Sequence, residues 1–309
     1  MTNVLFAAPD SRWEQYRDPL RAAFAEAGVE AELSRDHAPE EVDYIVFAPN
    51  GPVEDFTPFT RCKAVLNLWA GVENIVTNET LTQPLARMVD DGLTQGMVEW
   101  VTGHVLRHHL GMDAHIRNPD DEWKPEAPPL AQDRRVTILG LGALGTACAR
   151  MLAQIGFDVT GWSRSEKTVE GITCRSGVGQ LRAALESADI LVLLLPLTEA
   201  TENILNVQTI SYLPKGAVIL NPGRGGLIAD DALLEALDEG HIAHATLDTF
   251  REEPLPAGHA YWNDPKVTVT PHIASETRPD TAARVIAENV RRGEAGEPFL
   301  HLVDRGAGY

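Results

Sequence analysis

The sequence predicts an α/β fold with two doubly wound parallel sheets, one in each of two domains, and a cleft between the domains. Two separate parts of the chain alternate short apolar runs with helical patterns, which is typical of sheets built from βαβ units. The second part opens on a glycine-rich turn between a strand and a helix. With 309 residues, 44% of them hydrophobic, the chain is long and apolar enough to build two cores.

The first α/β part begins at the N-terminus. Three apolar runs predict strands and one amphipathic pattern, closed by a glycine, predicts a helix: 3–8, 43–49 and 63–69 for the strands, 12–27 for the helix and Gly28 for its end. A long helical pattern follows at 94–117. Residues 118–130 are rich in proline and acid, and they predict an arm or linker.

The second α/β part has the stronger pattern. Its predicted strands are 136–140, 157–162, 190–196, 217–221, 244–248 and 267–271, and its predicted helices are 143–155 and 178–187. A last helix at about 278–293 is free to return to the first part. We therefore expect residues 1–100 plus 285–309 to form a discontinuous substrate domain, and residues 101–284 to form a dinucleotide-binding domain that includes the linker helix and the arm.

Composition restricts the function classes. A net charge of −19 opposes binding to nucleic acid or to an anionic membrane. No run approaches the length of about 20 apolar residues that a membrane span needs, and the N-terminus does not resemble a signal peptide. The three cysteines are odd in number and lack metal-ligand spacing, which predicts reduced thiols in the cytoplasm and no metal site.

The glycine-rich turn reads GLGALG at 140–145. In this context Gly140 allows a tight turn, Gly142 lets a pyrophosphate approach the backbone, and Gly145 lets the helix pack on the strand. The amides of Ala143 and Leu144 open the helix, where a phosphate binds favourably. The turn predicts a Rossmann-like dinucleotide site.

The residues after the next strand bear on the choice of cofactor. An enzyme that uses NAD commonly places an acid there to bind the ribose 2′-hydroxyl. This chain has Ser163, Arg164 and Ser165, with Lys167 close behind. Hydroxyls and cations suit a 2′-phosphate, so NADPH is expected to be preferred over NADH. The alternative is an ordinary solvated loop with incidental charges.

Three further motifs accompany the glycine turn: NPGRGG at 221–226, LDTFREEPLP at 247–256 and TPHIA at 270–274. Together they resemble the D-isomer-specific 2-hydroxyacid dehydrogenases over nearly the whole chain. GWSRSEK, DEWKP, TPHIASETRP and the C-terminal VDRGAGY are similar to the glyoxylate/hydroxypyruvate reductase A-like branch of that family.

The resemblance implies NADPH-dependent reduction of glyoxylate or hydroxypyruvate to a D-2-hydroxy acid by hydride transfer. His272 would give a proton to the keto oxygen. Glu253 would hold the far ring nitrogen and raise the pKa of the histidine. Arg224 would polarise the keto oxygen and bind the substrate carboxylate. A larger 2-keto acid substrate, or a dinucleotide-sensing protein without catalysis, remains an alternative.

The remaining roles also follow from the resemblance. Substrate would meet the backbone amides of Ala70, Gly71 and Val72, beside a bulky Trp69. Cofactor would meet Leu195, Pro196, Pro222, Gly223, Asp248, His272 and Ala274. Asp248 has the alternative of a simple strand-end cap, and Trp69 that of core packing. We also expect a homodimer around 94–117, in which the arm and its Trp123 either reach the partner's active site or pack locally.

Overall fold

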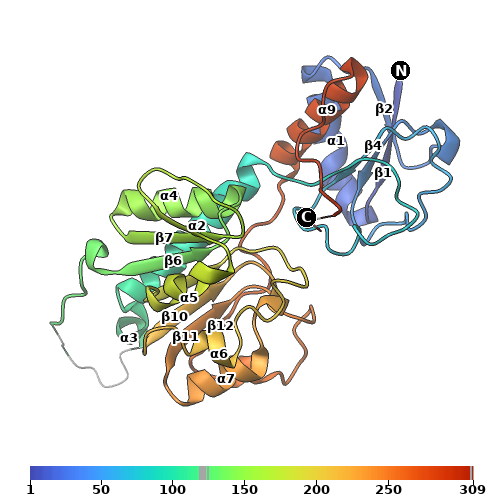
Figure 1. Cartoon of the computed structure of the whole chain (residues 1–309). Helices are drawn as coiled ribbons and strands as arrows, with labels where there is room; N and C mark the ends of the chain where they lie inside the picture. The colour runs from blue at the N-terminus through green and yellow to red at the C-terminus, as the bar shows by residue number, and fades with distance from the viewer. Residues whose placement is uncertain (118–122, 124, 307, 309) are drawn as a thin grey trace. The chain divides into compact units, whose positions relative to one another are not determined.

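The computed structural model describes residues 1–117, 123, 125–306 and 308. The chain forms two compact units, Met1–Leu93 with Thr277–Tyr309 and Thr94–Glu276. Each unit carries its own parallel α/β sheet, which confirms the predicted fold class of two doubly wound domains. Figure 1 shows the two sheets with their covering helices.

The first unit is built on a five-stranded sheet in the order β2-β1-β3-β4-β5, and all of its strand pairs are parallel. Its strands are β1 Thr2–Ala7, β2 Ala31–Ser34, β3 Tyr44–Phe47, β4 Ala64–Asn67 and β5 Leu85–Ala86. Helices α1 Asp10–Glu26 and α9 Pro279–Ala295 lie side by side on one face (Figure 1). They bury Tyr16, Leu20 and Ile286 there, while Phe47 and Phe56 fill the core of the other face.

The second unit has a seven-stranded parallel sheet in the order β12-β11-β10-β9-β6-β7-β8. Its strands are β6 Arg135–Leu139, β7 Asp158–Ser163, β8 Thr173–Ser176, β9 Ile190–Leu193, β10 Ala217–Asn221, β11 Ile242–Leu247 and β12 Val267–Val269. The strand order reverses between β6 and β9. In such sheets the crevice outside the carboxyl ends of the strands, at the reversal, binds ligands.

Helices cover both faces of this second sheet. They are α2 Asp91–His109, α3 Met112–Arg117, α4 Ala143–Ile155, α5 Val178–Glu186, α6 Val207–Ile210, α7 Asp230–Asp238 and α8 Ala260–Asn263. One core contains residues of α2 and α4, and the other contains residues of α5, α6 and α7. The chain also has three short 3₁₀ helices: η1 Pro39–Glu41 in the first unit, and η2 Ala131–Asp133 and η3 Gly225–Leu227 in the second.

The structure has three strands and the helices α6, α7 and α8 that were not predicted, and it divides one expected helix in two. Strands β2, β5 and β8, which were not predicted, all lie at sheet edges, where a strand is short and needs no long apolar run. The helix expected over 94–117 ends at His109, and a second one begins at Met112. Gly111 between them has a φ of +62°, a left-handed conformation that glycine adopts readily and that interrupts a helix.

The changes of unit also lie elsewhere than expected. The sequence places them after residues 100 and 284, whereas the chain changes unit after Leu93 and after Glu276. All of α9 packs in the first unit, including its early residues Ala282 and Ala283. Periodicity locates a helix but does not say which core its apolar face covers.

Every helix among the described residues is too short or too polar to cross a lipid bilayer.

Candidate active site

The glycine turn connects β6 to α4 and depends on close backbone contacts. Gly140 has a φ of +112°, and its N–H donates to the carbonyl oxygen of Trp162 at 2.8 Å. A Cβ at Gly145 would lie 1.8 Å from the carbonyl oxygen of Gly140, so any side chain there would push the helix off the turn. A Cβ at Gly142 would meet nothing within 4 Å. The turn is thus tight behind Gly145 and open at Gly142, an arrangement that fits a dinucleotide pyrophosphate against the N-terminus of α4.

β7 ends at Ser163 and leads into a mostly exposed loop. Ser163 is buried, and its Oγ donates to the carbonyl oxygen of Ser165 at 2.7 Å. The side chains of Arg164, Ser165 and Lys167 are exposed. Ser163 therefore shapes the loop, and the other three are accessible to an anionic group.

Arg224 follows β10 and is held by a residue that the sequence analysis did not single out. Asn221 is 1% exposed at the end of β10. Its Nδ2 donates to the carbonyl oxygen of Arg224 at 2.9 Å, and its Oδ1 accepts from the Gly223 N–H at 3.2 Å. An asparagine before a Pro-Gly pair is a recognisable turn signal, and it could have identified Asn221 as the residue that shapes this turn.

The glycines after Arg224 have a packing role. A Cβ at Gly225 would lie 2.0 Å from the carbonyl carbon of Phe250 and 2.4 Å from the Arg251 nitrogen. The turn after Arg224 thus lies backbone against backbone with the loop after β11. Glu253 belongs to that loop, so the two motifs NPGRGG and LDTFREEPLP meet at Gly225.

His272 and Glu253 form a direct pair. The Nδ1 of His272 lies 2.7 Å from Oε2 of Glu253, and Oε1 of Glu253 accepts from the Phe250 N–H at 2.9 Å. Their side chains are 49% and 35% exposed, so the pair is open to solvent. His272 has a φ of +53°, a strained conformation for a histidine, of the kind found at functional sites.

The pair shifts both acidities in the sense that acid catalysis requires. The hydrogen bond to Glu253 raises the pKa of His272; burial and the Arg224 charge oppose this effect, but the balance remains a raised pKa. Burial favours the neutral form of Glu253, yet the hydrogen bonds from His272 and Phe250, with the nearby cations, leave its pKa lowered. The pair therefore favours the protonated form of the histidine beside a carboxylate.

Asp248 organises the TPHIA loop from beneath. Its side chain is fully buried at the end of β11. Oδ1 accepts from Thr270 Oγ1 at 2.6 Å and from the Ile273 N–H at 2.9 Å, and Oδ2 accepts from the Ala274 N–H at 2.9 Å. The backbone N–H of His272 donates to the carbonyl oxygen of the same aspartate at 2.9 Å. Asp248 thus fixes the segment on which His272 stands.

The other residues expected to bind cofactor lie at the ends of the same parallel strands. Leu195 and Pro196 follow β9, and Pro222 and Gly223 follow β10. Leu195, Pro222 and Gly223 are buried and Pro196 is half-buried. Ala274 is 2% exposed and packs in the core with Met97 and Val98, so its contribution to a ligand is limited to its backbone.

The substrate loop of the first unit follows β4. Asn67 is 1% exposed, and its Nδ2 donates to the carbonyl oxygens of Trp69 and Gly71 at 3.0 and 3.1 Å. Trp69 is partly buried against the core beneath α1 and α9, in agreement with its packing alternative. Ala70 and Gly71 are half-buried, whereas Val72 is 2% exposed in the core of the opposite face. The loop is preformed by Asn67, which the sequence analysis did not single out.

No group of three or more His, Cys, Asp or Glu side chains that could hold a metal occurs in the described part of the chain.

The model of one protein family matches this chain: D-isomer specific 2-hydroxyacid dehydrogenase, NAD binding domain, over residues 102–274. The chain belongs to this family. The match confirms the predicted resemblance, and it means that the second unit of this dehydrogenase binds a nicotinamide dinucleotide.

Named relatives and solved structures narrow the similarity within the dehydrogenase family. Glyoxylate/hydroxypyruvate reductase A from Serratia proteamaculans is 38% identical and the same-named protein from Yersinia enterocolitica 36%, each over 99% of this chain and 100% of the relative. A D-isomer specific 2-hydroxyacid dehydrogenase from Xanthobacter autotrophicus, solved with NADPH and MES, is 39% identical with a TM-score of 0.93, covering 100% of this chain and 99% of its own. An NADPH-dependent glyoxylate/hydroxypyruvate reductase from Sinorhizobium meliloti, solved with NADP and sulfate, is 34% identical with a TM-score of 0.87, covering 100% of both chains.

Proposed function

We propose that this protein reduces small 2-keto acids, with glyoxylate and hydroxypyruvate as its leading substrates, to D-2-hydroxy acids. The observation that carries the proposal is the 2.7 Å pair between His272 and Glu253 in the same unit as Arg224 and the dinucleotide turn. The names of the full-length relatives support the same substrates.

Bound NADPH supplies the hydride. Because Nδ1 of His272 is engaged by Glu253, the proton for the keto oxygen resides on Nε2 of the same ring. Glu253 orients the imidazolium and favours its charged form. The guanidinium of Arg224 has donors enough to bind the substrate carboxylate and to polarise the keto oxygen.

The first-unit loop is also proposed to bind substrate. The backbone amides of Ala70, Gly71 and Val72 would hold the carboxylate, and the indole of Trp69 would limit the size of the group on the keto carbon. Asn67 holds two carbonyl oxygens of this loop, which keeps the loop in one conformation.

The preference for NADPH rests on the loop after β7. Arg164, Ser165 and Lys167 are exposed there and suit the adenosine 2′-phosphate. Two structural relatives were solved with NADPH or NADP. Gly140, Gly142, Ala143, Leu144 and Gly145 would hold the pyrophosphate, and Leu195, Pro196, Pro222, Gly223, Asp248, His272 and Ala274 would line the nicotinamide half.

A homodimer built around α2 and α3 belongs to the same proposal. Trp123 is 94% exposed in a single chain, and such an indole gains by burial against a partner. Light scattering at micromolar protein should give the mass of two chains. The mass of one chain would refute the proposed dimer. A dimer in which Trp123→Ala keeps full activity would refute only the proposal that the arm contributes to the active site.

We also place the protein in the cytoplasm, in keeping with three cysteines that form no disulfide.

The test is a panel of 2-keto acids, small and bulky, assayed with NADPH and with NADH. Glyoxylate and hydroxypyruvate should show the highest kcat/KM, with NADPH preferred and D-glycerate formed from hydroxypyruvate. Arg224→Lys should raise KM and lower kcat, because one ammonium does not replace a two-point grip. Binding of NADPH without turnover of any 2-keto acid would favour a dinucleotide sensor. A preference for bulky acids would favour a dehydrogenase of the same family that acts on larger 2-keto acids.

A further inference from the structure

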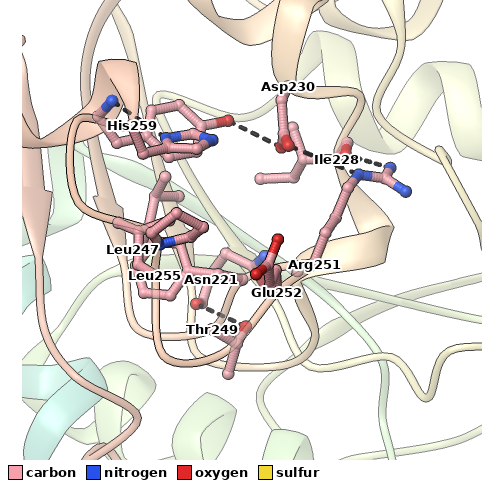
Figure 2. A pocket seen from close by; sticks show the side chains of 13 residues that line it. Asn221, Ile228, Asp230, Leu247, Thr249, Arg251, Glu252, Leu255 and His259 are labelled. Carbon is pink, nitrogen blue, oxygen red and sulfur yellow. Dashed lines mark hydrogen bonds and ion pairs between the residues drawn. The ribbon is translucent and has the colours of Figure 1, made fainter.

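The loop that carries Glu253 borders a cavity on one side, while its residues Phe250 and Leu255 pack against the core on another. The cavity has a volume of about 200 Å³. Figure 2 shows the side chains of Asn221, Thr249, Glu252, Leu255 and His259 around it. On the side of the cavity the loop lacks apolar partners, so polar contacts there contribute more to its position.

One side chain of this loop reaches across to the turn that follows Arg224. The Nη2 of Arg251 donates to the carbonyl oxygen of Ile228 at 2.6 Å and lies 3.4 Å from that of Gly226. In Figure 2 the guanidinium extends from the loop toward Ile228 and Asp230. Gly226 is two positions after Arg224, and Arg251 is two positions before Glu253, so this contact joins the two catalytic segments directly.

The same guanidinium is held from other sides. Nη2 also donates to Oδ1 of Asn203, Nε lies 3.6 Å from Oδ2 of Asp230, and Nη1 lies 3.5 Å from Glu202. Asp230 is fixed in turn by the hydroxyl of Tyr261 at 2.9 Å. A guanidinium has hydrogen-bond donors on all three of its nitrogens, so it can make this set of contacts. A lysine ammonium has a single nitrogen and cannot.

We propose that Arg251 is a positioning residue that clamps the Glu253 loop onto the turn carrying Arg224. The inference rests on the proposed function only in that Glu253 and Arg224 serve the same reaction. Gly225 allows the two backbones to touch, and Arg251 holds them together at that contact. The clamp keeps Glu253 at 2.7 Å from His272 without itself touching the ring.

The test uses the titration of His272, because a merely structural loss would leave it unchanged. The charged groups that face His272 are Glu253, Arg224 and Asp248. With the full-length protein and bound NADPH, Arg251→Ala should lower the pKa of His272, measured by NMR with His272→Gln to assign the signal. The alkaline limb of keto-acid reduction should move to lower pH with it, and kcat should fall about tenfold or more.

Arg251→Lys should give a smaller change in the same direction. Arg182→Ala is the matched control, because Arg182 forms an exposed ion pair with Glu186 on α5, outside this loop. In the double variant with Glu253→Gln, Arg251→Ala should add no further shift, since the two act through the same contact.

A pKa of His272 that stays at its wild-type value in Arg251→Ala would overturn the inference, even if the melting temperature falls. Should Arg251→Ala not fold, Arg251→Lys decides by the same measurement. A shifted pKa in a protein that reduces no 2-keto acid would support the clamp and refute the proposed function. Reduction of 2-keto acids by a protein whose His272 pKa is unshifted in Arg251→Ala would support the proposed function and refute the clamp.

Discussion

Two regions of the seven-stranded sheet are built in opposite ways, although both are expected to touch the cofactor. At the ends of β10, β11 and β12, backbones touch at Gly225, and the buried carboxylate of Asp248 accepts three hydrogen bonds. At the end of β7, three of the four proposed cofactor side chains are exposed, and Ser163 shapes the loop through one hydrogen bond. The first region is a buried frame and the second is an exposed loop.

The difference follows from what each region must do. Proton transfer to a keto oxygen depends on distances of about 3 Å and on one ring orientation, so small displacements are costly. Attraction between a phosphate and a cation falls slowly with distance and tolerates flexible side chains. Substitutions in the frame should therefore affect chemistry strongly, and substitutions in the loop should mainly affect the choice of cofactor.

The largest effect is expected at His272. His272→Asn removes the proton donor but leaves a polar group, and kcat for keto-acid reduction should fall by about 10²-fold or more. Stopped-flow measurement of NADPH oxidation would show the loss in the chemical step itself. His301→Asn, at an exposed position of the first unit, is the control and should match wild type. Near-full turnover by His272→Asn would refute its assignment as the acid.

Gly225→Ala should come next. Its Cβ would lie 2.0 Å from the backbone of Phe250, so the two catalytic segments must separate. We expect a loss of about 1–3 kcal/mol of stability by overpacking and a fall in kcat of about tenfold or more. Gly179→Ala is the matched control, since a Cβ there meets nothing within 4 Å; it should keep activity and melting temperature. Equal activity and melting temperature in the two variants would show that neither depends on the close backbone contact at Gly225.

Glu253→Gln should change the pH profile more than the rate at low pH. Glu253 raises the pKa of His272, and reduction needs the protonated ring, so activity falls as pH rises through that pKa. A neutral amide stabilises the imidazolium less, which lowers the pKa and moves the alkaline limb to lower pH. Glu252→Gln, the neighbouring exposed carboxylate, should leave the limb in place. Movement of the limb to higher pH in Glu253→Gln would contradict the assigned proton path.

The smallest effect is expected in the loop after β7. Arg164→Ala should reduce the ratio of kcat/KM for NADPH over NADH by about fivefold to tenfold, as expected for one lost charge-assisted contact. The kcat with saturating NADPH should change little, because the loop does not hold the reacting groups. An unchanged ratio would mean that Ser163 or Lys167, rather than Arg164, determines the preference for NADPH. A large loss of kcat would show that the loop is as rigidly coupled to catalysis as the strand ends.

The sequence by itself determined the α/β class, most of the central strands and the family. These features depend on local signals: an apolar run, a glycine spacing, or Arg, Glu and His in a specific order within short motifs. The same signals identified Arg224, Glu253 and His272, of which the last two are in direct contact in the structure. They also placed Arg164 and Lys167 after a strand, in an exposed loop whose properties depend little on the rest of the fold.

Tertiary structure alone decided how the motifs support one another. The contact of Gly225 with Phe250, the reach of Arg251 to Ile228, and the hydrogen bonds of Asp248 to the TPHIA loop join residues that lie about 20 to 30 positions apart. The edge strands β2, β5 and β8 and the membership of the early residues of α9 in the first unit were decided in the same way. Such contacts depend on which strands become neighbours in a sheet and on which core a helix covers, and a pattern within one segment does not contain that information.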